Sequence, residues 1–211
     1  MNPTDVLGGH RIVPVVVLDD PAKADALGAA LVEGGLPVAE ATFRTPEAAM
    51  VLRRLAERDD LVVGAGTVLT ARQVDEALEA GARFVVSPGL STSVVRRCQE
   101  AGVPVVPGIS TPSEIMQALD LGLDTVKFFP AEANGGLATI KALAAAFPQV
   151  RFMPTGGITV ESAPAYLEHP SVAAVGGSWM VAGDLLKDGR WDEVATRCAA
   201  STALYAQGAP A

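Results

Sequence analysis

The sequence contains few of the residues that build metal centres or disulfide frameworks. Only two cysteines and two histidines occur among its 211 residues. Cys98 and Cys198 stand alone in helix-like segments, without a CxxC or Cys/His spacing, and His10 and His169 are far apart. Zinc sites need closely spaced ligands and disulfide scaffolds need paired cysteines, so we expect neither a metal site nor a disulfide framework.

Basic residues are also scarce, and they form no cluster. The formal net charge is -8 and the pI is about 4.7. A protein that binds nucleic acid or an anionic membrane displays a basic patch, so we expect neither partner. A small anion stays possible, because backbone N–H groups and one or two cations are enough to hold it.

Long apolar runs are missing as well. The N-terminus has no basic region followed by an apolar segment, and no later stretch is long and apolar enough to span a bilayer. These absences predict a soluble cytoplasmic protein. With 49% hydrophobic residues the chain can bury a substantial core, which predicts one domain over residues 1–211 with a frayed tail at 206–211.

What the sequence does contain is a repeat of short β-rich apolar runs, each followed by an Ala-rich amphipathic stretch. This alternation is typical of a parallel sheet covered by helices. The predicted strands span residues 11–18, 37–43, 61–66, 84–87, 103–107, 125–128, 151–154 and 172–175. The predicted helices span residues 21–33, 46–58, 70–79, 92–101, 111–121, 136–147, 160–167 and 191–206.

Eight strand–helix units predict a (β/α)₈ TIM barrel with short loops, because each unit has only roughly 26 residues. Most of the strands are almost continuously apolar, as expected when both faces of a parallel sheet are covered. A doubly wound open sheet is the alternative. No GxGxxG or P-loop sequence follows a predicted strand, which removes the usual nucleotide-binding argument for it.

Lys127 is the most informative residue at the predicted rim, where the carboxyl ends of the strands carry the chemistry of such barrels. It is one of four lysines, and it stands in the apolar strand TVKFFP. Burial disfavours the ammonium and favours the neutral amine, which can attack a ketone carbon. The alternative is a lysine that snorkels past Phe128 to solvent.

The predicted strand at 37–43 and the residue after it contain a second set of polar side chains. Strand alternation puts Glu40, Thr42 and Arg44 on one face of an otherwise apolar segment. Glu40 could move protons, directly or through a water, while Arg44 could hold a substrate carboxylate. The alternative is a structural ion pair between Glu40 and Arg44 at the rim.

Two glycine pairs close the last two strands, Gly156-Gly157 after Thr155 and Gly176-Gly177 before Ser178. Barrels of this type often bind phosphate at these two positions through backbone N–H groups and a helix N-terminus. Glycine allows close approach and positive φ angles. Each pair alone is simply a turn signal, but both at the appropriate strands predict an anion site.

Seven stretches together resemble the 2-keto-3-deoxy-6-phosphogluconate (KDPG) and 4-hydroxy-2-oxoglutarate (KHG) aldolase family, which also includes 2-keto-3-deoxy-6-phosphogalactonate aldolases. They span nearly the whole chain, and KFFPAE is the most specific. The stretches are VAEATFRTP (38–46), VGAGTVL (63–69), VSPGL (86–90), VPGISTPSE (106–114), KFFPAE (127–132), PTGGI (154–158) and GGSW (176–179).

The resemblance implies a class I aldolase that needs no metal or other cofactor, acts on a small keto acid and forms a homotrimer. It implies that Lys127 forms the Schiff base and that Glu40 is the acid/base. The implied substrate-binding residues are Arg44 and Thr67 for the pyruvyl carboxylate, Pro88 and Phe129 for the pocket wall, Thr155 for a hydroxyl, and Gly156, Gly157, Gly177 and Ser178 for phosphate.

One departure from the family pattern concerns the phosphate. Many relatives have Arg or Lys just after the first strand, where this chain has Leu18, Asp19 and Asp20. The resemblance implies KDPG cleavage to pyruvate and glyceraldehyde 3-phosphate, and the departure leaves the phosphogalactonate epimer and 4-hydroxy-2-oxoglutarate open as alternative substrates.

Two further functions stay open on the sequence alone. A phosphosugar isomerase or epimerase would use the same glycine loops, but it would need a base pair of carboxylates or histidines rather than a buried lysine. A non-catalytic barrel that binds a partner would need no reactive amine at all.

Overall fold

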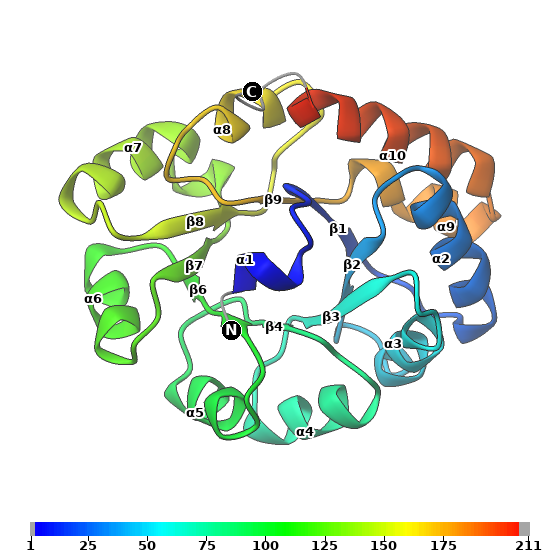
Figure 1. The fold of residues 1–211 in the computed structure, drawn as a ribbon, viewed down its shortest axis with the longest axis horizontal. Coiled ribbons are helices and arrows are strands. Elements are labelled where there is room, and N and C mark those ends of the chain that lie inside the picture. The colour runs from blue at the N-terminus through cyan, green and yellow to red at the C-terminus, as the bar shows by residue number, and fades with distance from the viewer. Residues whose placement is uncertain (1–2, 207–211) are drawn as a thin grey trace.

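The computed structural model describes residues 3–206, and its strands all run parallel (Figure 1). One sheet has the order β5-β4-β3-β2-β1-β9 and the other has the order β6-β7-β8. The strands are β1 (Ile12–Val16), β2 (Val38–Thr42), β3 (Val62–Gly66), β4 (Val85–Val86), β5 (Val105–Val106), β6 (Gly108–Ile109), β7 (Thr125–Phe128), β8 (Arg151–Pro154) and β9 (Val175–Gly177).

The two sheets are arcs of one closed ring. Pro107 is the single residue between β5 and β6. Because proline has no N–H to donate, the hydrogen-bond ladder is interrupted there. At the other junction, the isolated bridges Phe152–Val172 and Thr155–Gly176 connect the end of β8 with β9. Counting β5 and β6 as one strand gives eight, so the (β/α)₈ prediction is confirmed and the open-sheet alternative is wrong.

Helices cover the outside of the ring (Figure 1). They are α2 (Ala24–Glu33), α3 (Ala48–Ala56), α4 (Ala71–Glu79), α5 (Thr92–Glu100), α6 (Pro112–Asp120), α7 (Gly136–Ala146), α8 (Ala163–Leu167), α9 (Gly183–Asp188) and α10 (Trp191–Ala206), with single turns η1 (Pro21–Lys23), η2 (Glu132–Asn134) and η3 (Trp179–Val181). The predicted Thr111–Glu114 capping box opens α6, and Thr70 caps α4. No helix within residues 3–206 is both long and apolar enough to cross a membrane.

Several predicted boundaries are wrong for local reasons. The predicted strand 172–175 lies mostly before β9, which instead includes Gly176 and Gly177. The predicted helix 160–167 begins only at Ala163, because Thr159 and Ser162 bond each other's backbone N–H groups in a turn. The predicted tail begins one residue too early, since Ala206 still belongs to α10, and residues 207–211 lie outside the described range.

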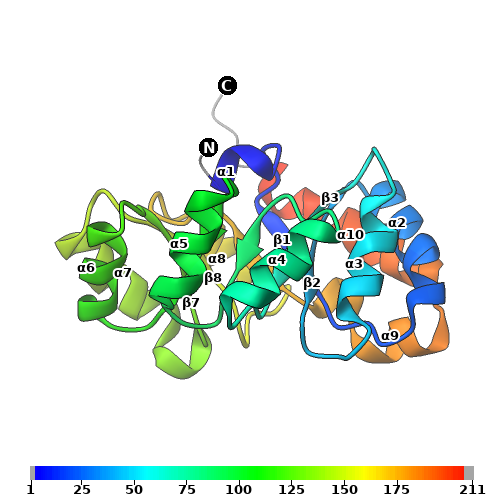
Figure 2. The same ribbon diagram turned by 90° about the horizontal axis from the view of Figure 1, so that it is seen from below.

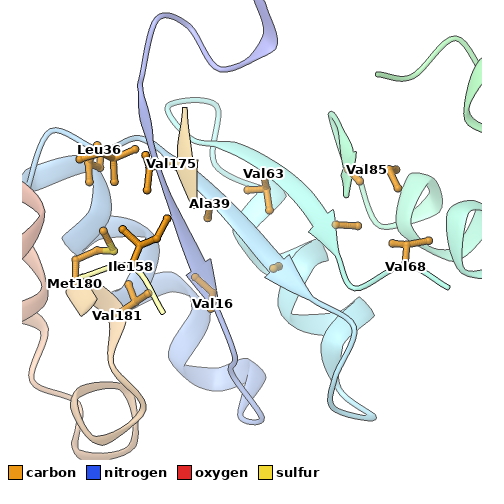
Figure 3. Packing of buried hydrophobic residues seen from close by; sticks show 14 of the residues in the cluster. Val16, Leu36, Ala39, Val63, Val68, Val85, Ile158, Val175, Met180 and Val181 are labelled. Carbon is orange, nitrogen blue, oxygen red and sulfur yellow. The ribbon is translucent and has the colours of Figure 1, made fainter. Parts of the chain in front are cut away.

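The core has an outer and an inner part. The outer part lies between the strands and the helices, where Val16, Val175 and Met180 are among the packed side chains (Figure 3). The inner part fills the barrel interior and consists of Leu7, Val13, Val38, Phe84, Val86, Val106, Met153 and Ala174.

The short helix α1 (Pro3–Val6) lies over the amino-terminal ends of the strands, in the centre of the ring in Figure 1 and above it in Figure 2. Functional groups therefore gather at the opposite mouth.

Candidate active site

Lys127 and Glu40 meet inside the barrel. Lys127 lies on β7 and is 2% exposed, while Glu40 lies on β2 and is fully buried. The Nζ of Lys127 donates to Oε1 of Glu40 at 3.2 Å, across 87 residues of sequence. The prediction that Lys127 is buried is confirmed, and the alternative of a snorkelling lysine is wrong.

A gain in stability does not explain why this ion pair is buried. Moving each charge out of water costs on the order of several kcal/mol, and apolar residues often replace such a pair without loss of protein stability. Oε2 of Glu40 has no hydrogen-bond partner among the described residues, so it is free to accept a proton or a water. The Nζ of Lys127 lies 5.1 Å from the ring centre of Phe129. The arrangement offers an amine, a proton acceptor and an apolar wall within one small volume.

Gly66 provides the space that the Glu40 side chain occupies. Gly66 is the last residue of β3, and a Cβ atom at this position would overlap the Glu40 carboxylate. Because Glu40 is buried and bonded to Lys127, a side chain at position 66 would move the carboxylate away from its partner. The glycine in the stretch VGAGTVL is therefore a steric requirement of the site.

Arg44 contacts Thr67 rather than Glu40. The Arg44 Nε donates to Oγ1 of Thr67 at 3.0 Å. Thr67 directly follows β3 and adopts a φ of 57, a left-handed conformation that is uncommon for a β-branched residue. The predicted structural pair of Glu40 with Arg44 is thus wrong, since Glu40 pairs with Lys127. Thr42, on the same face as Glu40, donates to the backbone oxygen of Val16 instead.

A cavity of about 210 Å³ opens at the mouth of the barrel. Arg44 is the one charged side chain in its wall, among the residues that the structure describes. The wall consists of Val15, Val17, Arg44, Phe129, Thr155, Gly156, Gly157, Ile158, Gly176, Gly177 and Ser178. Oγ1 of Thr155 is buried without a hydrogen-bond partner in residues 3–206. The predicted glycine loops, Thr155, Phe129 and Arg44 are therefore brought together.

The glycine loops reach the cavity for two different reasons. Gly156 and Gly157 have φ angles of 103 and 81, which glycine adopts without strain. Gly177 must be glycine because a Cβ there would overlap the ring of Trp179. The N–H groups of these loops stand before the short helix α8 and the turn η3, so the loops themselves supply the donors, rather than the start of a long helix.

Pro88, like Lys127, Glu40 and Thr67, is a predicted site residue that is not part of this cavity wall. It follows β4, and its backbone packs closely against Gly108 of β6. Its role in shaping a pocket stays a prediction.

Val15, Val17 and Ile158 line the cavity although we did not predict them, whereas Gly176 belongs to the predicted second glycine pair. The alternation of β1 contained the signal for the two valines, since every second residue shares a face.

The acidic stretch after β1, where many relatives have a basic residue, has a structural role. The side chain of Asp20 accepts from the N–H of Ala22 and caps η1. Within residues 3–206, no group of three or more His, Cys, Asp or Glu side chains could hold a metal ion.

Sequence comparisons connect this geometry with known proteins. Residues 4–197 match the family model for KDPG and KHG aldolase. The chain is 50% identical to the 2-dehydro-3-deoxy-phosphogluconate aldolase of Zymomonas mobilis over 170 residues, which covers 81% of this chain and 82% of the relative. It is 46% identical to the KHG/KDPG aldolase of Escherichia coli over 190 residues, covering 90% of this chain and 89% of the relative.

The fold comparison agrees. A crystal structure of KDPG aldolase from Legionella pneumophila, with pyruvate captured at low pH as a covalent carbinolamine intermediate, superimposes with a TM-score of 0.92. The sequences are 40% identical, and the match covers 95% of this chain and 98% of that one. With its buried lysine–glutamate pair at the mouth of a parallel barrel, the chain belongs to the KDPG and KHG aldolase family.

Proposed function

We propose that this enzyme is a class I aldolase that cleaves 2-keto-3-deoxy-6-phosphogluconate to pyruvate and glyceraldehyde 3-phosphate through a Schiff base on Lys127. The observation that carries the proposal is the buried amine of Lys127, 3.2 Å from the Glu40 carboxylate. A primary amine can condense with the C2 ketone only when it is uncharged, and the carboxylate beside it can take up the proton that the amine loses.

The proposed reaction uses the two residues in turn. The Lys127 amine attacks C2, Glu40 returns the proton that it took from the amine to the C2 hydroxyl, and loss of water gives a protonated imine. Glu40 removes the proton of the C4 hydroxyl, the C3–C4 bond breaks, and its electron pair moves into the imine to give an enamine. The aldehyde leaves, C3 is protonated with the help of Glu40, and water hydrolyses the imine to release pyruvate.

The cavity residues, together with Thr67 beside Arg44, suit the two ends of the substrate. We assign Arg44 and Thr67 to the pyruvyl carboxylate, since a guanidinium and a hydroxyl already contact each other there. Phe129 would pack against the pyruvyl methyl, and the unpartnered hydroxyl of Thr155 would bond a substrate hydroxyl. Phosphate would bind to Gly156, Gly157, Gly177 and Ser178, which are part of the cavity wall.

Product analysis tests this function. Incubation with the phosphogluconate keto acid should release pyruvate and triose phosphate in equal amounts, with no loss of rate in EDTA. An isomerase or epimerase would give a rearranged sugar without pyruvate, and a non-catalytic barrel would give no product, so either result would rule the proposal out. The same assay with the phosphogalactonate epimer and with 4-hydroxy-2-oxoglutarate, the substrate in the Escherichia coli relative's name, ranks the family's substrates.

Gly66→Ala should lower kcat by about 100-fold, because the added methyl group displaces the Glu40 carboxylate, and a misplacement of about 1 Å can cost that much. Steady-state kinetics of pyruvate release measures the effect. Gly183→Ala is the matched control, since nothing lies within 4 Å of its added Cβ. Unchanged kinetics in Gly66→Ala would show that Glu40 does not need its present position.

We also propose that the enzyme is a homotrimer, as the family resemblance implies, and that it acts in the cytoplasm, as the sequence predicts.

A further inference from the structure

The turn that follows β7 forms backbone hydrogen bonds with the loop at Gly156 and Gly157. The N–H of Ala131 donates to the Thr155 oxygen at 2.9 Å, and the N–H of Glu132 donates to the Gly156 oxygen at 3.0 Å. Gly157 also lies directly against Glu132: a Cβ on Gly157 would come within 2.7 Å of the Glu132 Cβ. Glu132 ends the stretch KFFPAE, and the proposed chemistry gives this residue no role.

The other side of the same loop is anchored to Glu132 by Tyr166. The Tyr166 hydroxyl, on α8, donates to Oε1 of Glu132 at 2.6 Å. Tyr166 is 2% exposed, and burial, followed by the hydrogen bond to Glu132, raises the pKa of its phenol. The phenol therefore stays protonated and keeps donating. Because α8 follows the loop in the chain, both ends of residues 156–166 are attached to Glu132.

We infer that Glu132 and Tyr166 are positioning residues that set the Gly156-Gly157 loop for the phosphate of the substrate. The inference rests on the proposed function. Two consecutive glycines have more backbone freedom than any other pair, so an unrestrained loop would lose entropy when its N–H groups gather around an anion. The contacts with Glu132 and Tyr166 fix the loop before the substrate arrives.

The contacts of Glu132 and Tyr166 confine their positioning role to the phosphate end of the substrate. Lys127 bonds Glu40 and Arg44 bonds Thr67, and neither Glu132 nor Tyr166 is a partner in those two bonds. Weakening the Glu132–Tyr166 bond should therefore affect phosphate recognition and leave the keto-acid end unchanged.

Tyr166→Phe and Glu132→Ala test the inference with two substrates, the phosphorylated keto acid and its unphosphorylated counterpart. Each variant should lower kcat/KM for the phosphorylated substrate about tenfold, equivalent to about 1.4 kcal/mol. The value for the unphosphorylated substrate should change by less than about twofold on the same scale. Glu132→Gln keeps a hydrogen-bond acceptor for Tyr166 and should restore near wild-type kinetics. Tyr205→Phe, which loses a contact with His10, is the matched control.

The outcomes separate this inference from the proposed function. Equal losses with both substrates, or no loss with either, would overturn the positioning role, as would a Glu132→Gln variant as impaired as Glu132→Ala. If Tyr166→Phe does not fold, the comparison of Glu132→Ala with Glu132→Gln decides by the same criteria. Failure of the wild-type enzyme to release pyruvate would instead overturn the proposed function.

Discussion

Lys127→Arg is expected to lower kcat/KM for pyruvate release by at least about 10⁴-fold, because a guanidinium cannot act as the nucleophile that forms an imine. Arginine keeps a positive charge beside Glu40, so the loss reports on the chemistry of the amine rather than on the charge. Lys141→Arg is the matched control, since Lys141 is an exposed lysine of α7. The measurement is steady-state pyruvate release with both variants.

Borohydride identifies the reacting amine directly. Reduction in the presence of pyruvate should add the mass of a reduced pyruvate imine to the wild-type chain, on the peptide that contains Lys127. The Lys127→Arg protein should stay unmodified. An adduct on Lys23, Lys141 or Lys187, or cleavage that survives the arginine substitution, would contradict the proposed mechanism.

Lys127→Met alone should destabilise the protein by about 3–5 kcal/mol, because it leaves the buried Glu40 carboxylate without its partner. The double variant Lys127→Met/Glu40→Leu should recover this loss and could exceed wild-type stability by about 1–4 kcal/mol, since apolar residues then fill the site. Urea unfolding of the wild type and both variants measures the free energies.

The two changes must therefore be strongly non-additive. A double variant that is less stable than Lys127→Met would mean that the pair contributes to the fold rather than only to the chemistry. Both variants should be inactive, which separates stability from function at one pair of residues.

Much of the fold could be predicted because neighbouring residues determine it. Apolar runs such as 61–66 form buried parallel strands, and the Thr111–Glu114 box opens a helix at its predicted place. Lys127 was recognisable because a lone lysine in an apolar strand is conspicuous. Local patterns also explain the errors: Gly176 and Gly177 carry a turn signal, yet they pair within a strand.

Other features depend on contacts between distant segments. The ion pair joins residues 87 positions apart, and no local pattern specifies that Glu40 would bond Lys127 rather than Arg44. Helix α1 has only four residues, too few for a periodic pattern, and its position over the barrel depends on the interior that it covers. The interruption at Pro107 was visible as a proline but not as a break between two sheets.

That break bears on how the protein reaches its native state. Lys127 lies on the three-stranded arc and Glu40 on the six-stranded arc, and the arcs are joined at Pro107 and through isolated bridges near Thr155. Neither arc alone can bring the two charges together, and contacts between distant segments form late in folding because the intervening chain must first be ordered. We therefore expect both side chains to stay hydrated until the ring closes, so that the cost of dehydrating them falls on the step that joins the two arcs.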